Sequence, residues 1–353
     1  MHSIFKQPSR IVQREFSILE LSNGFFQTFE HFFETLMLIL AIVVALSHLG
    51  PLSFERIVIK ALIMMTVVIG LYIFVGNSGV LSFGHSTFMI VSAYMSAWLT
   101  MTVMRKKIML PNIWEGFGLM EMHVLPGALL AGLLSAVLAM IVGVPLMRLS
   151  GIAAAIGTFA VFTIITVVYN QWDSFTKGAS TLIGLPTYVD LWTAFGFAAG
   201  ALLIAFAYDR SKFGLQLRAS REDMVAARAA GVNITLQRLI AFVVSAFVTG
   251  IGGVLYAHFT ATITQANLLY LNLTFITIVM LLVGGMRSLT GAVVGVIAIS
   301  IVSEGLRQIE KPVGVSGLGE LGLAAFMLLI LTVRPSGIAG GRELPMPAFL
   351  RRN

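Results

Sequence analysis

The sequence predicts an all-α fold: a polytopic integral membrane helical bundle of about ten transmembrane helices. Apolar residues make up 58% of the 353 residues and charged residues only 11%, whereas soluble domains have roughly 45–50% and about 25%. The 34 glycines point the same way, because small residues let membrane helices approach closely. The chain has no cysteine, which excludes disulfides, iron–sulfur clusters and thiolate metal sites.

Ten apolar runs follow one another along the chain, and each is interpreted as a membrane span. They cover residues 32–49, 57–75, 80–103, 123–146, 151–170, 190–208, 238–259, 268–285, 289–303 and 316–333. The ninth run is short for a span, so we expect it to be tilted, re-entrant or extended into its neighbours.

The runs define one transmembrane domain over residues 31–338. Residues 1–30 mix basic and apolar side chains, so we expect a segment that lies in the cytoplasm or on the membrane surface, in preference to a cleaved signal peptide. Residues 339–353 are predicted to be a short cytoplasmic tail.

The basic residues predict the orientation. With a cytoplasmic N-terminus, 15 of the 23 basic residues lie on the inner side, as the positive-inside rule prefers. Both termini are then cytoplasmic, and the net charge of +7 is a topology signal with no nucleic-acid partner implied. The cluster Arg105, Lys106 and Lys107 falls on the outer side, against the rule.

Several functional classes are disfavoured by what the sequence lacks. The middles of the ten runs contain no Asp, Glu, Lys or Arg, although ion-coupled transporters usually need ionisable groups within the bilayer. No lysine follows a glycine, so the chain has no P-loop for ATP. The six histidines form no His-x-x-x-His pair, and no Gly-x-Ser-x-Gly motif occurs, which disfavours a metal site or an enzyme.

One long basic loop interrupts the apolar runs, at residues 209–238, and it holds six of the 23 basic residues. Residues 222–230 are predicted to form a short helix, with Ser220 as its N-cap and Gly231 at its end. Such a helix could dock into the groove of a partner, or it could be a solvated connector.

A glycine-rich and polar break occupies residues 76–85 (GNSGVLSFGH). Non-helical backbone at membrane depth must be buried in protein or line a cavity, so one hypothesis is that Asn77, Ser82 and His85 line a path for a polar solute. The alternative is a tight turn with glycines that pack helices. Thr158 could face the same path or bond back to its own helix.

Two glycine pairs have the four-residue spacing that allows close helix contact. They are Gly196 with Gly200, and Gly291 with Gly295. Helix packing is the favoured interpretation of both.

Five segments together resemble the permeases of branched-chain amino acid (LIV-type) ABC importers, in particular their second permease type. The loop has Arg218-x-x-Arg221-Glu222-Asp223, then paired alanines, Gly231 and Asn233. The other four segments are residues 76–85, 241–256 (AFVVSAFVTGIGGVLY), 284–295 and 331–337 (LTVRPSG). The resemblance covers most of residues 60–338.

The resemblance implies a transport subunit of the bacterial plasma membrane without catalytic activity, cofactor or metal. It implies a homologous permease partner, in a hetero- or homodimer, two ATP-binding cassette subunits and an extracytoplasmic solute-binding protein, in contact with membrane lipid. The expected path residues are Asn77, Ser78, Ser82, His85 and Thr158. The expected coupling helix comprises Arg221, Glu222, Asp223, Ala226, Ala227, Ala230 and Gly231.

The implied substrates are branched-chain or related amino acids, and urea, amides or aromatic acids are alternatives. A self-sufficient secondary transporter or channel is the main rival function. An intramembrane enzyme is a lesser one.

Overall fold

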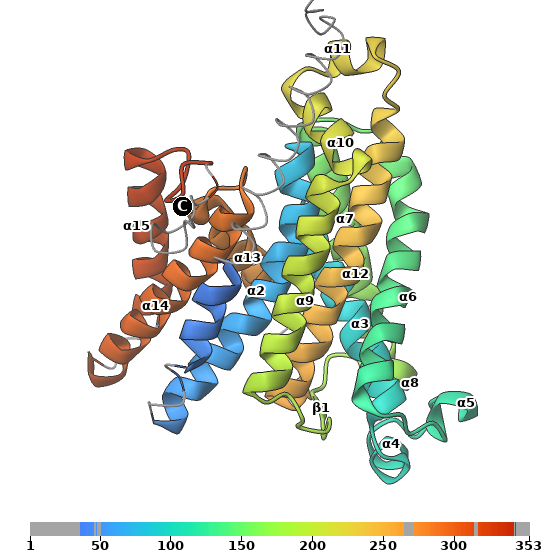
Figure 1. Cartoon of the computed structure of the whole chain (residues 1–353). Coiled ribbons are helices and arrows are strands. Elements are labelled where there is room, and N and C mark those ends of the chain that lie inside the picture. Colours follow the sequence, from blue (N-terminus) through green and yellow to red (C-terminus); the bar gives the residue numbers. More distant parts are fainter. Residues whose placement is uncertain are drawn as a thin grey trace, which may run out of the picture.

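The computed structural model describes residues 36–45, 47, 51–264, 271–313, 317–341 and 343, and this part of the chain is almost entirely helical (Figure 1). The longer helices are α2 (Leu52–Ser78), α3 (His85–Thr100), α6 (Val124–Leu146), α7 (Ile152–Gln171), α9 (Leu191–Arg210), α10 (Lys212–Glu222), α12 (Ile234–Thr260), α13 (Leu271–Gly284), α14 (Leu289–Val313) and α15 (Leu318–Val333). The short elements are α4 (Val103–Met109), α5 (Glu115–Gly118), α8 (Asp173–Thr176), α11 (Met224–Ala229), β1 (Leu182–Ile183) and β2 (Thr262–Ile263).

The all-α prediction is confirmed, and each of the ten apolar runs contains a helix. Within the described residues, six helices are long and apolar enough to cross a membrane: α2, α6, α7, α9, α12 and the Leu289–Glu310 part of α14. The other runs hold the shorter helices Leu36–Ala45, α3, α13 and α15. The chain is therefore a multi-pass membrane protein, while ten crossings and cytoplasmic termini stay predictions. The segment 1–30 and the tail beyond residue 343 lie outside the described residues.

The ninth run is part of a longer helix than its apolar stretch suggests. α14 continues through Glu304 and Arg307 to Val313, and the two charged side chains pair at 2.6 Å one turn apart. Of the three arrangements predicted for this run, extension into the neighbouring sequence is the one observed.

Two helices form the centre of the bundle. In the most apolar 18 residues of each helix, 83% of α2 and 72% of α12 are buried, against 33% of α6 and 22% of α7. Glycine makes the central contacts close. A Cβ added to Gly253 would lie 2.4 Å from the Met89 carbonyl oxygen, and one added to Gly70 would lie 2.5 Å from Thr249 Oγ1. The outer helices α6 and α7 expose leucine, isoleucine and phenylalanine side chains, as lipid-facing helices do.

The two predicted glycine pairs have different roles. Gly291 and Gly295 pack α14 against α13, since an added Cβ would lie 2.1 Å from the Gly285 oxygen or 1.9 Å from the Met280 oxygen. A Cβ at Gly196 or Gly200 would meet no atom within 4 Å. The packing prediction is confirmed for the first pair. It is not met for the second among the described residues, since none of their atoms lies within 4 Å of such a Cβ.

The two ends of the bundle differ in structure (Figure 1). α10 and α11 project from one end, where α2 and α9 finish and α12 begins. α4, α5, α8 and β1 lie at the opposite end, where β1 pairs antiparallel with β2. The basic loop and the Arg105–Lys107 segment are thus at opposite ends of the molecule.

Candidate functional site

The break after α2 is shorter than the sequence predicts. Gly76, Asn77 and Ser78 form the last turn of α2, and Gly79 ends the helix with φ of 70°, a left-handed conformation that glycine adopts without strain. The Ser78 hydroxyl accepts a hydrogen bond from Val80 N at 3.1 Å. The non-helical segment is therefore residues 79–84.

This segment runs back into the bundle. His85, which follows it, is linked through Ser245 to the carbonyl of Gly70. Gly70 lies nine residues before Gly79, a distance of about 13 Å along the helix axis. Residues 79–84 thus form irregular backbone inside the protein, at a depth where such backbone needs protein partners.

Thr158 on α7 provides one of those partners. Its Oγ1 accepts a hydrogen bond from Phe83 N at 3.3 Å and donates to the Ala155 carbonyl at 2.9 Å. Gly84 lies against the same turn, and a Cβ there would be 2.4 Å from the Thr158 carbonyl oxygen. Thr158 therefore bonds back to its own helix, as one of the two interpretations predicts, and it also contacts the break. That it faces a path stays a prediction.

His85 links three elements of the core. The Ser245 hydroxyl donates its proton to the Gly70 oxygen at 2.6 Å, so it accepts from His85 Nε2 at 2.7 Å. Nδ1 is then an acceptor for the Ser82 hydroxyl, also at 2.7 Å, which is the neutral form of the ring. Phe74, Phe88 and Phe242 surround the imidazole, with ring centroids 5.5–5.7 Å away. His85 is completely enclosed by these contacts.

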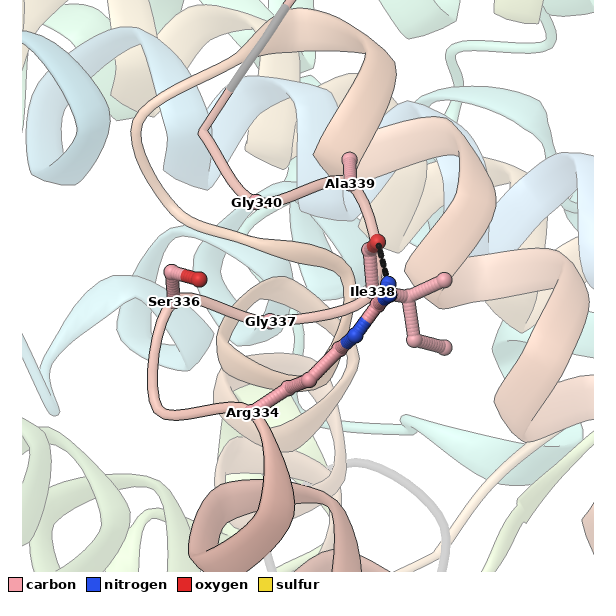
Figure 2. A pocket seen from close by; sticks show the side chains of 6 residues that line it. All are labelled: Arg334, Ser336, Gly337, Ile338, Ala339 and Gly340. Carbon is pink, nitrogen blue, oxygen red and sulfur yellow. Dashed lines mark hydrogen bonds between the residues drawn. The ribbon is translucent and has the colours of Figure 1, made fainter.

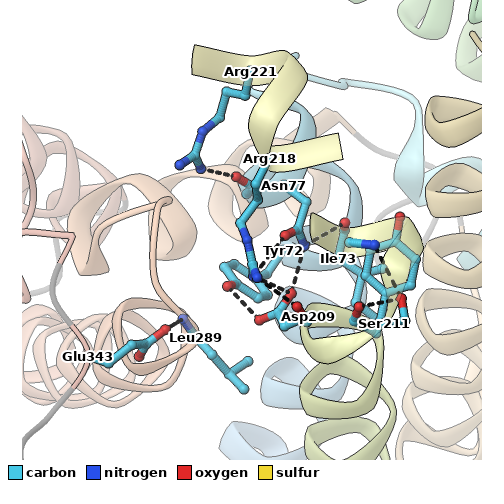
Figure 3. A network of polar contacts seen from close by, with 12 residues as sticks. Tyr72, Ile73, Asn77, Asp209, Ser211, Arg218, Arg221, Leu289 and Glu343 are labelled. Atoms are coloured by element: carbon cyan, nitrogen blue, oxygen red, sulfur yellow. Dashed lines mark hydrogen bonds and ion pairs between the residues drawn. The ribbon is translucent and has the colours of Figure 1, made fainter. Parts of the chain in front are cut away.

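Asn77 belongs to a second polar cluster, which is centred on Asp209 at the end of α9 (Figure 3). Asn77 Nδ2 and Tyr72 Oη each donate to the Asp209 carboxylate at 2.9 Å. Arg218 Nη1 lies 3.5 Å from the same carboxylate and also donates to Asn77 Oδ1. The carboxylate charge is thus matched by one arginine and two neutral donors, as a buried charge requires.

The same cluster attaches α10 to the end of α2. Arg218 Nη2 donates to the Asp209 backbone oxygen at 2.6 Å, and Arg221 Nη1 donates to the Gly76 oxygen. The aliphatic part of Arg221 also covers Gly79, where an added Cβ would lie 2.8 Å from Arg221 Cγ. The basic loop is therefore bonded directly to the point where the break begins.

The loop contains two helices and not one. α10 continues through Ser220 to Glu222, and the Ser220 hydroxyl donates to the Leu217 oxygen within that helix. The N-cap of α11 is Asp223, whose carboxylate accepts from Val225 N at 2.8 Å and Ala226 N at 3.0 Å. The predictions of Ser220 as N-cap and of a helix starting at residue 222 are wrong, because α10 satisfies the Ser220 hydroxyl itself.

The two backbone N–H groups also hold the pKa of Asp223 below its usual value, since they favour the charged carboxylate. The predicted helix end is confirmed at Gly231, which has φ of 81°. Of the apolar residues of this segment, Ala227 is buried, and Met224 and Ala230 are exposed. α11 lies beyond the end of the bundle (Figure 1).

The five predicted path residues lie along or beside the break, in four groups. Asn77 joins the Asp209 cluster, Ser78 accepts from Val80 N, Ser82 and His85 bond to each other, and Thr158 contacts Phe83. Each side chain bonds to protein in this conformation. Whether any of them contacts a solute stays a prediction.

Sequence reasoning missed Tyr72, Asp209 and Ser245. Asp209 had one available signal: it is an acidic residue at the end of an apolar run, followed by arginine. Nothing in the local pattern pointed to Tyr72 or Ser245, since their partners are 137 and 175 residues away.

A cavity of about 330 Å³ lies elsewhere, at the turn after α15 (Figure 2). It is lined by Arg334, Ser336, Gly337, Ile338, Ala339 and Gly340. The Arg334 side chain points across it and donates to the Ile338 oxygen at 3.3 Å. Apart from Arg334 and Ser336 the lining is glycine and small or apolar side chains, and this cavity contacts neither polar cluster.

Comparison with known proteins identifies the family. The family model described as branched-chain amino acid transport system / permease component matches residues 53–333. The chain belongs to this permease family. The match includes the break, both polar clusters and the loop with α10 and α11.

Three curated relatives of this chain are named as branched-chain amino acid transport permease proteins. The high-affinity branched-chain amino acid transport system permease protein LivM of Salmonella typhimurium is 26% identical over 337 residues, covering 86% of this chain and 74% of the relative. LivM of Escherichia coli is 24% identical over 341 residues, with coverage of 86% and 75%. A probable LivM of Methanocaldococcus jannaschii is 28% identical over 163 residues, with coverage of 43% and 47%. No solved structure matches the permease.

Proposed function

We propose that this permease is the membrane-spanning subunit of an ABC importer and that it forms the translocation path for branched-chain or related amino acids. The observation that carries the proposal is the bonding of the basic loop to the bundle. α11 stands beyond the end of the bundle, and α10 connects it through Arg218 and Arg221 to the last turn of α2. A helix pair in this position suits the transfer of motion from a soluble motor.

The proposed assembly contains a second homologous permease, as a hetero- or homodimer, two ATP-binding cassette subunits and an extracytoplasmic solute-binding protein. The complex sits in the bacterial plasma membrane, with the basic loop and both termini in the cytoplasm and about ten spans. The permease itself performs no covalent chemistry. ATP binding and hydrolysis in the partners supply the energy.

The contacts of the loop support a coupling mechanism. Movement of α11 displaces α10, to which it is joined through Asp223. α10 then shifts the last turn of α2, because Arg221 bonds Gly76 and Arg218 bonds the Asp209 cluster. The break that follows α2 is irregular backbone and has no helical hydrogen-bond ladder to resist such a shift. Alternating access would follow from two arrangements of this region.

Substrate choice is proposed from the relatives alone. The LivM proteins are named for branched-chain amino acids, and aliphatic amino acids are the first substrates to test. Transport of urea, amides or aromatic acids in the same assay would redirect the substrate assignment and leave the permease role intact.

A cross-linking experiment tests the docking of α11. The chain has no cysteine, so Val225→Cys gives a single thiol on the exposed surface of α11, and Val137→Cys, on the exposed face of α6, is the matched control. We expect a bifunctional reagent to join the Val225→Cys variant to an ATP-binding subunit and to leave the control unlinked. Equal yields from both variants would contradict the proposal.

A further inference from the structure

The segment between α3 and α6 forms a hairpin, defined here as residues 103–120, that contains α4 and α5. It lies at the end of the bundle opposite α10 and α11, and α5 extends sideways beyond the end of α6 (Figure 1). The hairpin joins the end of α3 to the start of α6, a span whose outer face is apolar and exposed. Its position is therefore where these helices meet one membrane surface.

The hairpin has a defined internal structure. The Lys106 side chain is completely buried, and its Nζ donates to the carbonyl oxygens of Phe117, at 3.0 Å, and Met120. Met122 N donates to the Leu99 oxygen at 2.8 Å, which ties the far end of the segment to α3. The Phe117 ring packs against Trp98 with centroids 5.6 Å apart. These contacts fix which side chains the hairpin presents outward.

The outward side chains are large and apolar. Met104 and Ile108 lie one turn apart on α4 and are 75% and 66% exposed, and Trp114 and Leu119 are 66% and 71% exposed. The exposed face of α6, which follows in the chain, is also apolar and begins with Leu125, Leu129 and Leu133. Large exposed apolar side chains in such number mark a contact with lipid or protein.

Charge and aromatic content favour lipid. Tryptophan is enriched at membrane–water interfaces, and lysine next to apolar side chains can extend its ammonium to the phosphates. Lys107 is exposed on α4 beside this surface. An amphipathic segment with these features lies in the interface plane, with its apolar side chains at the boundary of headgroups and acyl chains.

We propose that the hairpin is an interfacial membrane anchor. Met104, Ile108, Trp114 and Leu119 insert at the acyl boundary of the leaflet opposite α10 and α11, and Lys107 pairs with phospholipid phosphate.

The anchor also gives the basic cluster at residues 105–107 a physical role. Lys106 stabilises the hairpin from inside, Arg105 donates to the Gly184 oxygen at 2.7 Å, and Lys107 faces the headgroups. The cluster therefore has structural and lipid partners at the end of the bundle where the positive-inside rule predicts few basic residues.

Spin labels on single cysteines test the anchor in the permease reconstituted alone in phosphatidylcholine and phosphatidylglycerol vesicles. Met104→Cys and Ile108→Cys probe the apolar side of α4, Lys107→Cys is the control on the same helix, and Leu133→Cys marks the lipid-facing part of α6. We expect collisions with oxygen, relative to collisions with a water-soluble nickel chelate, to be several-fold more frequent at 104 and 108 than at 107. The ratio of oxygen collisions to nickel-chelate collisions should be higher still at position 133. Equal ratios at 104, 107 and 108, all favouring the nickel chelate, would overturn the proposal.

A second measurement avoids new cysteines. Fluorescence quenching by phospholipids brominated near the headgroup end of the acyl chain is compared between the unaltered chain and Trp114→Phe. A shallow anchor predicts that the unaltered chain loses a larger share of its emission than the variant. If the fraction of emission lost is the same in both proteins and Trp114 is instead quenched by aqueous iodide, the surface faces water. The lipid proposal then fails, and a protein would be the alternative occupant.

Discussion

Replacing Arg218 by alanine removes two contacts between α10 and the end of α9. Arg218 donates to the Asp209 carbonyl at 2.6 Å and pairs with the Asp209 carboxylate at 3.5 Å. A hydrogen bond from a charged donor contributes about 1.5–3 kcal/mol. The ion pair adds at most about 1 kcal/mol, because 31% of the Arg218 side chain is exposed.

The expected cost is about 3 kcal/mol, which corresponds to a roughly 150-fold increase in the equilibrium constant for detachment of α10 from the bundle. Hydrogen–deuterium exchange of peptides from residues 212–222, with the permease in lipid nanodiscs, measures this opening directly. Arg228→Ala is the matched control, since Arg228 is exposed in the same loop, and it should change protection by only a few-fold. Unchanged protection in Arg218→Ala, or a change no larger than in the control, would refute the attachment of the loop through Arg218.

Three further predictions concern the break and α11. Gly84→Ala should prevent folding or lower the melting temperature by several degrees, because the new Cβ would lie 2.4 Å from the Thr158 carbonyl oxygen. The control Gly200→Ala, with no described atom within 4 Å of its Cβ, should leave the melting temperature unchanged or raise it. Ser245→Ala should cost about 1–3 kcal/mol by leaving His85 Nε2 without its hydrogen-bond partner. Adding His85→Phe should recover part of the loss in chemical unfolding, and additive losses would argue against the bond. The pKa of Asp223 is lowered, so its cap should stabilise α11 fully above the ordinary pKa of about 3.9 and be lost as the pH falls through the lower folded value. Hydrogen-exchange protection of residues 224–229, corrected for intrinsic rates, should therefore stay constant from about pH 5 to 8. A decline in protection within that range would contradict the cap.

Local sequence patterns predicted the helical elements well. Apolar runs located every long helix of the described residues except α10, because the requirement for about 20 apolar residues leaves a strong signal. Gly231 was placed correctly at the end of α11, since a left-handed residue after a helix strongly favours glycine. Predicted helix boundaries were wrong where two residues could each serve as the N-cap. Ser220 and Asp223 are both good N-caps, and only the packing of α10 against the bundle decides between them.

The sequence alone did not predict which polar side chains pair when they are far apart along the chain. The contact of His85 with Ser245, 160 residues later, exists because α12 brings that hydroxyl to the ring. Asn77 and Asp209 are 132 residues apart and meet because α2 and α9 pack side by side. The glycine spacing on α9 is the same as on α14, yet among the described residues only the α14 pair has atoms packed against it. In each case a residue's role depends on which neighbour the fold supplies.

ATP-dependent uptake in proteoliposomes tests whether this chain is the membrane-spanning subunit of an ABC importer. The permease is reconstituted with its homologous permease, the ATP-binding subunits and the solute-binding protein, and accumulation of radiolabelled leucine is followed with and without internal ATP. We expect uptake only when every component and ATP are present. Equal uptake by this chain alone, without ATP, would show a self-sufficient transporter and contradict the account.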